Sequence, residues 1–184
     1  MKKIIIIRGK VTSGKTTTSY ELAKVLPGWI FIDPWKIKEM FEPLNLKDRK
    51  PLKKASKKAM IEIMKVVIRD LEINIIVQET SQKFIKKFLR NDLNKHNYKI
   101  YSFFLDVELD DAIKRDVQRE KPTMNINKEI KNKEEWKTRI LPEKGDFIIN
   151  TSQNKINEVV DIILKQIEEK RKNNPNAHLI RRCW

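Results

Sequence analysis

Apolar residues gather along the chain in short runs separated by longer mixed segments. A continuous run of β-branched residues is typical of a strand buried on both faces of a parallel sheet. The clearest such run is Ile4–Ile7. Further strands are expected at Trp29–Ile32, Ile73–Val77, Tyr98–Leu105 and Phe147–Asn150.

Helices are expected between these strands, at Lys15–Leu26, Pro51–Leu71, Gln82–Leu93, Asp110–Arg119 and Lys155–Arg171. The long helix at 51–71 is amphipathic. Its expected buried face consists of Leu52, Ala55, Ala59, Ile63, Met64 and Val67. Strands that alternate with helices predict an α/β fold, a five-stranded parallel sheet with helices on both faces.

The chain has 184 residues and no internal repeat or glycine-serine linker. We therefore expect one domain over residues 1–172 and a C-terminal tail over 173–184. A polar segment rich in lysine and asparagine predicts a mobile lid at about residues 120–137. No apolar run reaches the roughly 18 residues of a membrane span, and the single cysteine, Cys183, excludes an internal disulfide. A cytoplasmic protein without membrane contact is expected.

The formal net charge is +15, which favours a polyanionic partner such as RNA or DNA. A lysine-rich composition also arises from an A/T-rich genome or a heat-adapted proteome. Charge alone therefore leaves both a nucleic-acid acceptor and a small-molecule acceptor open.

The residues after the first strand match the pattern G-x-x-x-x-G-K-[ST] at every fixed position. They are Gly9, Lys10, Val11, Thr12, Ser13, Gly14, Lys15 and Thr16, followed by Thr17. The glycines allow a tight turn whose N–H groups face phosphate oxygens, and the following helix directs its positive end at the same anion. We expect Lys15 to reach the β- and γ-phosphates of ATP and the Thr16 hydroxyl to bind Mg²⁺. The pattern predicts a P-loop NTPase fold.

Acidic residues follow two other strands, where ligands of parallel sheets bind. Asp33 can accept a proton from an acceptor hydroxyl or help to hold Mg²⁺ through water. It can equally cap a helix that begins at Pro34. Glu79 is a candidate Mg²⁺-site acid, or a solvated residue before a helix.

Arg115 and Arg119 lie four residues apart on one helical face. They can neutralise the charge of a transferring phosphoryl group, or form an ion-paired surface face with Asp111. Trp35 can stack on a base or line a groove, and Lys36 follows it as a candidate substrate contact.

With these motifs in place, the chain up to about Lys170 resembles the small P-loop kinases. The nearest likeness is to the kinase part of phage-type polynucleotide 5′-kinase, with zeta-toxin, gluconate and shikimate kinases as wider relatives. It is carried by "GKVTSGKT", the acid after the second strand, "KRDVQRE" as a lid-type arginine pair, and "DFIINTSQNKINEVVDII", which looks like the part that borders the adenine. The likeness implies Mg·ATP as donor and a hydroxyl group as acceptor.

One position departs from this pattern. Many of these kinases carry the catalytic acid two residues past an Asp33-like position, where this chain has Trp35. Three functions follow as hypotheses: a kinase that acts on a nucleic acid or nucleotide-like hydroxyl, a small-metabolite or nucleotide kinase, and a nucleotide-dependent RNA-binding or regulatory protein without phosphotransfer.

Overall fold

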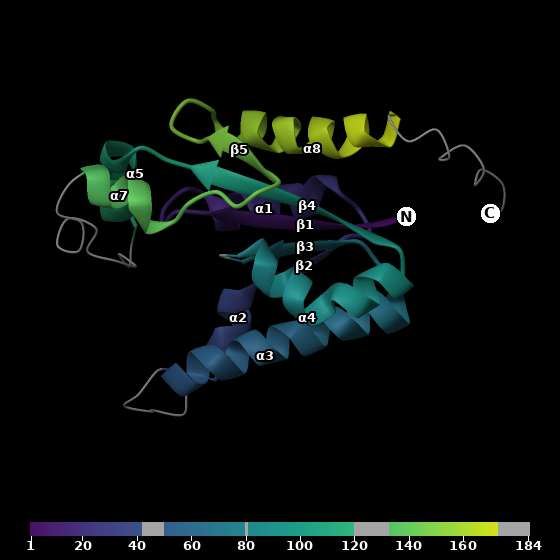
Figure 1. Ribbon diagram of the computed structural model, residues 1–184. Coiled ribbons are helices and arrows are strands. Elements are labelled where there is room, and N and C mark those ends of the chain that lie inside the picture. Colours follow the sequence, from purple (N-terminus) through teal and green to yellow (C-terminus); the bar gives the residue numbers. More distant parts are fainter. Residues whose placement is uncertain (42–49, 80, 120–132, 173–184) are drawn as a thin grey trace.

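Five parallel strands form the centre of the molecule in the order β2-β3-β1-β4-β5 (Figure 1). The structure is a computed structural model that describes residues 1–41, 50–79, 81–119 and 133–172. Its strands are β1 (Lys2–Gly9), β2 (Ile30–Ile32), β3 (Ile75–Gln78), β4 (Tyr98–Asp106) and β5 (Asp146–Asn150). Its helices are α1 (Lys15–Val25), α2 (Pro34–Glu39), α3 (Lys50–Val66) with the π-helical turn η2 (Val67–Leu71), α4 (Gln82–Lys95), α5 (Leu109–Val117), α7 (Lys133–Arg139) and α8 (Ile156–Lys172).

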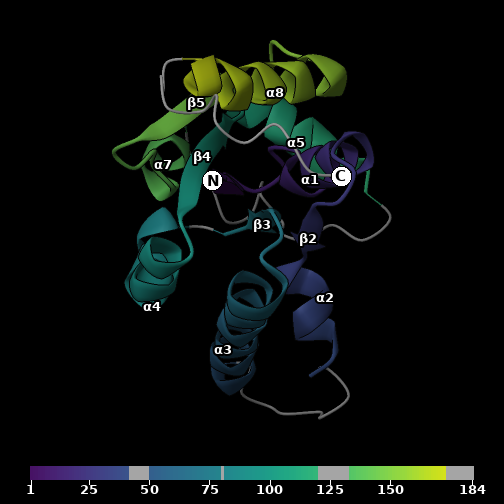
Figure 2. The same cartoon turned by 90° about the vertical axis from the view of Figure 1, so that its right-hand side faces the viewer.

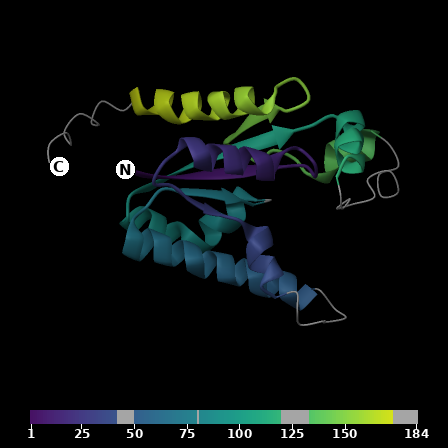
Figure 3. The same ribbon diagram turned by 180° about the vertical axis from the view of Figure 1, so that it is seen from behind.

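Helices cover both faces of the sheet, which confirms the predicted α/β fold. Helices α1 and α8 lie on one face, and α3 and α4 lie on the other (Figure 2). Seen from behind, α1 lies between the viewer and the strands (Figure 3). No helix in the described part of the chain is long and apolar enough to span a bilayer.

The central strand β1 connects the two halves of the core. Ile4 and Ile6 pack with α3 and α4, whereas Ile5 and Ile7 pack with α1 and α8, and none of the four side chains is exposed. Each fully buried isoleucine contributes about 1.5–3 kcal/mol of transfer free energy. The prediction of a strand buried on both faces is therefore confirmed.

The buried face of α3 differs in part from the prediction. Ile63 is 40% exposed, and Ala55 and Ala59 are only partly buried, whereas Met60 and Ile61, which were not predicted, are buried. Helix α3 packs against both α2 and α4.

The expected lid spans residues 120–137, of which 120–132 lie outside the described residues. Its last part belongs to helix α7, where Trp136 is buried and donates its indole N–H to the Val107 carbonyl at 2.9 Å. This part of the segment thus packs against the domain. The tail at 173–184 also lies outside the described residues, as does the junction 42–49.

A buried ionic network fixes the end of β1. The guanidinium of Arg8, which directly precedes Gly9, pairs with Asp146 and with Glu143. Asp146 also accepts hydrogen bonds from the Ser102 hydroxyl and the Gln82 amide. Glu143 accepts from the Ser81 hydroxyl and from the Lys83 backbone N–H, and so stabilises the N-terminus of α4.

Candidate active site

The loop between β1 and α1 has the backbone of a phosphate cradle. Gly9 and Gly14 have φ angles of 139° and 86°, and Thr12 has a φ of 59°. Left-handed residues in such a turn direct successive N–H groups into one concavity, which binds anions. Thr12 tolerates this conformation because its hydroxyl donates to the Ala112 carbonyl at 3.1 Å, which fastens the loop to α5.

Lys15 lies at the start of α1, beside the cradle. Its ammonium group donates to the Lys10 carbonyl at 2.5 Å. Burial, and to a lesser degree the positive charge of Arg119, lower the pKa of Lys15 to about 8. Such a lysine gains from an arriving anion, because the anion restores the charged form.

Two further groups suit a bound phosphate and Mg²⁺. Within the described part of the chain, the buried Ser13 hydroxyl has no hydrogen-bond partner. The Thr16 hydroxyl donates to the Gln78 side-chain oxygen at 3.2 Å. Hydroxyl and amide oxygens are hard ligands that suit Mg²⁺ alongside phosphate oxygens. Gln78, the last residue of β3, was not a predicted site residue; its position at the carboxyl end of a central strand is the signal that could have found it.

Lys10 is part of the cradle, but its side chain leads away from it. Its ammonium group pairs with Asp106 at 2.7 Å and lies 5.5 Å from the centre of the Trp136 ring. Lys10 therefore joins the loop to the end of β4 and to α7. Its backbone carbonyl is the part that faces Lys15.

A pocket of about 290 Å³ opens on one side of the cradle. The residues that line it come from the cradle, α2, α3, the end of β3 and the segment after α7: Gly9, Val11, Lys15, Pro34, Trp35, Lys38, Ser56, Lys57, Met60, Gln78, Glu79 and Ile140. Lys57 pairs with Glu79 at 3.1 Å, and the ammonium group of Lys38 lies 4.9 Å from the centre of the Trp35 ring. The pocket thus combines an aromatic face, three lysines and one carboxylate.

The predicted site residues of this region divide into two groups. Trp35 and Glu79 line the pocket, whereas Asp33 and Lys36 are not among the described residues that do so. Asp33 caps α2: one carboxylate oxygen accepts the Trp35 N–H at 2.9 Å and the other accepts the Tyr20 hydroxyl at 3.4 Å. The helix-cap interpretation of Asp33 is confirmed. Lys38, which the sequence did not single out, takes the place expected for Lys36.

A second pocket, of about 210 Å³, lies on the other side of the cradle. It is lined by Ser13, Gly14, Thr17, Thr18, Arg115, Thr151, Asn154, Ile156 and Val159. The turn between β5 and α8, expected to border the adenine, supplies several of these residues. Thr17 also lies here, next to the two cradle residues.

The structure separates the two predicted arginines. Arg115, in α5, donates to the Thr151 carbonyl at 2.6 Å, to its hydroxyl at 3.2 Å and to the Thr12 carbonyl at 3.4 Å, so it belongs to the second pocket. Arg119 lies just beyond the end of α5, and its positive charge helps to lower the pKa of Lys15.

Comparison with known proteins shows which solved structures share this fold. No protein-family model matches the sequence. Nor does a curated protein match it. Solved structures do match: a putative kinase from Chloroflexus aurantiacus is 18% identical, with a TM-score of 0.68 over 91% of this chain and 97% of that one.

Two further structures show the same fold. The tunicamycin resistance protein of Deinococcus radiodurans is 20% identical, with a TM-score of 0.64 over 91% of this chain and 96% of that one. The Mycobacterium tuberculosis APS kinase CysC, in complex with AMPPNP and APS, is 13% identical, with a TM-score of 0.60 over 91% and 98%. At these identities the likeness shows the fold alone, a parallel α/β sheet with helices on both faces.

Proposed function

We propose that the protein is an ATP-dependent kinase that transfers the γ-phosphate of ATP to a hydroxyl group. The observation that carries this proposal is the arrangement of two pockets on either side of one cradle. Ser13, Gly14 and Thr17 line the pocket beside Arg115, whereas Gly9, Val11 and Lys15 line the pocket beside Trp35. If the base of ATP lay in the pocket beside Arg115 and the acceptor in the pocket beside Trp35, the acceptor would reach the γ-phosphate at the cradle.

The cradle and Lys15 would hold the phosphates, and Thr16 with Gln78 would face the Mg²⁺ ion. When bound, Mg²⁺ neutralises phosphate charge. In the transfer, the acceptor oxygen forms a bond to the γ-phosphorus while the bond from that phosphorus to the β–γ bridging oxygen breaks. ADP leaves with that electron pair, and the hydroxyl proton passes to a carboxylate. Arg119 would stabilise the charge on the moving phosphoryl group.

Glu79 is the carboxylate that the pocket favours for this proton. It lines the acceptor pocket, where it pairs with Lys57, whereas Asp33 lies outside that lining and caps α2. The substitutions Glu79→Gln and Asp33→Asn test the choice, because asparagine caps helices as well as aspartate does. A general base contributes about 10²–10⁴-fold, so we expect a loss of that size in kcat for Glu79→Gln and a change below about threefold for Asp33→Asn. The reverse pattern would return the role to Asp33.

A planar, anionic acceptor fits the pocket best. The Trp35 ring can stack on a base, and Lys38 and Lys57 can neutralise phosphate charge. We therefore infer a nucleotide-like acceptor, either free or at the end of a polynucleotide, as in the polynucleotide 5′-kinase and zeta-toxin group. A small metabolite is the second candidate, because the structural neighbours include an APS kinase in complex with APS.

Labelled ATP tests the proposal directly. The purified protein is incubated with γ-labelled ATP and Mg²⁺, together with 5′-hydroxyl RNA or DNA, nucleosides, nucleoside monophosphates or sugars. We expect label on one class of hydroxyl, with Lys15→Ala as the inactive control. If ATP binds and none of these acceptors becomes labelled, the kinase proposal fails and a nucleotide-dependent binding protein remains.

A further inference from the structure

A third, larger hollow lies away from the cradle, between α4 and the first residues of β4. Its volume is about 610 Å³. Four cationic side chains border it: Lys86, Lys87 and Arg90 from α4, and Lys99 from β4. We call this feature the α4 groove. Leu93 and Ile100 also line it and supply its apolar part.

The positive charge of the α4 groove is uncompensated by nearby carboxylates. Among the described residues, none of its four cations forms an ion pair with an aspartate or glutamate. Lys86 donates to the Gln82 side-chain oxygen at 2.6 Å, and Lys87 lies over the Phe88 ring. The one acidic residue of α4, Asp92, is already bound by Arg69 through two hydrogen bonds. The groove therefore attracts anions.

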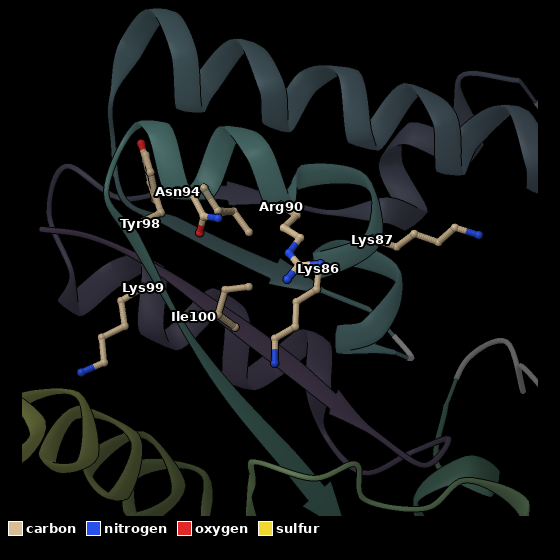
Figure 4. Close-up of a pocket in the computed structure, with 8 residues that line it drawn as sticks. Lys86, Lys87, Arg90, Asn94, Tyr98, Lys99 and Ile100 are labelled. Carbon is tan, nitrogen blue, oxygen red and sulfur yellow. The ribbon is translucent and has the colours of Figure 1, made fainter.

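The cations are spread along the groove. In Figure 4 the head groups of Lys86 and Arg90 lie on the Ile100 side of β4, Lys87 points away, and Lys99 extends from the other side of the strand. Lys86 and Arg90 are one helical turn apart, about 6 Å along the axis. A single phosphate would call for side chains that converge on one point, whereas this spacing suits a chain of phosphates.

Two further residues border the groove. Asn94 contributes a side-chain amide, and Tyr98 packs its ring against the core and donates its hydroxyl to the Ile73 carbonyl at 2.9 Å (Figure 4). In addition, β4 pairs with β5 only from Ser102 onward, so that within the described sheet the residues at 98–101 pair with β1 alone. A positively charged groove that follows the backbone is a feature of single-strand binding sites.

We propose that the α4 groove binds a single strand of nucleic acid. Its four cations, spread along one helix and the neighbouring strand, follow the spacing of a phosphate backbone. The inference rests on the proposed function where it names a polynucleotide as the substrate of the kinase. Binding of the strand itself does not require phosphate transfer. The bound strand would run along α4 and add its phosphate contacts to the affinity of the acceptor.

Fluorescence anisotropy with a labelled oligouridylate of about 12 nucleotides, without ATP, tests the groove. The double variant Lys86→Glu with Arg90→Glu is compared with Lys54→Glu and Lys58→Glu. Both pairs are exposed, both lie four residues apart on a helix, and both change the net charge equally. We expect the groove variant to bind at least about tenfold more weakly and to reduce the slope of log K against log salt by about 1.4. The α3 variant should differ from wild type by less than about threefold.

Other results overturn the proposal. Equal weakening by the two double variants would show general attraction to a chain of charge +15. Competition by poly-glutamate as strong as that by unlabelled RNA would indicate an acidic peptide as the ligand instead. Lys15→Ala separates this claim from the kinase proposal: it should abolish transfer, whereas the difference in RNA binding between the two double variants should persist when each also carries Lys15→Ala. A wild-type protein that binds RNA through the groove and phosphorylates nothing would refute the kinase proposal alone.

Discussion

Replacing Arg115 by alanine should weaken the binding of ATP and leave the transfer step largely intact. The guanidinium holds the β5–α8 turn against the cradle through two good hydrogen bonds to Thr151, at 2.6 and 3.2 Å. The third contact, to the Thr12 carbonyl at 3.4 Å, is near the limit of a hydrogen bond and counts for little. Arg115→Ala thus removes one wall of the second pocket.

The magnitude follows from these contacts. A hydrogen bond from a charged group contributes about 1.5–3 kcal/mol. Because the Arg115 side chain is partly exposed, water weakens these bonds, and we expect the two together to contribute only about 1.5–3 kcal/mol. Since about 1.4 kcal/mol corresponds to a factor of ten, the KM for ATP should rise by roughly 10- to 100-fold. The variant Arg115→Lys keeps the charge but lacks the planar fork, and should recover only part of the loss.

Initial rates at saturating acceptor, with ATP varied, separate KM from kcat, and the binding of a fluorescent ATP analogue measures affinity directly. Arg119→Ala is the matched control, because this arginine acts near Lys15. It should lower kcat by roughly 10²-fold or more with little change in the KM for ATP. A fall in kcat for Arg115→Ala, with unchanged nucleotide affinity, would refute the separation of roles.

Three further outcomes are expected. Gly9→Ala should lower the urea-unfolding free energy by at least about 2 kcal/mol more than Gly14→Ala: a Cβ at Gly9 would lie 2.2 Å from the Leu105 carbonyl oxygen, and one at Gly14 no closer than 4.0 Å to another side chain. Equal losses would contradict this close approach. The pKa of Lys15 is lowered to about 8, so the affinity for ATP, measured by calorimetry, should fall as the pH rises through about 8. Between pH 8 and 10.5 the native chain holds fewer protons on Lys15 than the unfolded chain does, because the unfolded pKa is 10.5. The contribution of this lysine to the free energy of unfolding should therefore rise with pH over that range. Trp136→Phe leaves the buried Val107 carbonyl without its donor and should cost about 1–3 kcal/mol in thermal unfolding; an unchanged midpoint would show that this bond contributes nothing.

Local patterns in the sequence predicted much of the fold and the cradle. A few neighbouring residues are enough to predict three features: the buried strand at Ile4–Ile7, the cradle from Gly9 to Thr16, and the helix start at Asp33-Pro34. The bounds of the strands and helices differ from the prediction by a few residues in either direction: pairing lengthens some strands, whereas β2 and β3 begin later than predicted. Strand β1, for example, continues to Gly9, which pairs with Leu105 of β4.

Contacts between distant segments could not be predicted in this way. The helical spacing of Arg115 and Arg119 predicted a pair, yet Thr151, on a different element, holds Arg115 in the second pocket. Lys10 belongs to the cradle motif, but Asp106 and Trp136 hold its side chain elsewhere. Gln78 is uncharged and belongs to no motif. It reaches Thr16 because β3 lies beside the cradle in the folded sheet.

The buried pairing of Arg8 with Asp146 has a consequence for the synthesis of the chain on the ribosome. The two residues lie 138 positions apart, so the cation that precedes the cradle has no carboxylate from β5 until the ribosome has added that many further residues. An unpaired charge in the middle of a sheet is costly. The phosphate cradle, although it is made early in the synthesis of this domain, should therefore be among the last parts of the domain to reach its final shape.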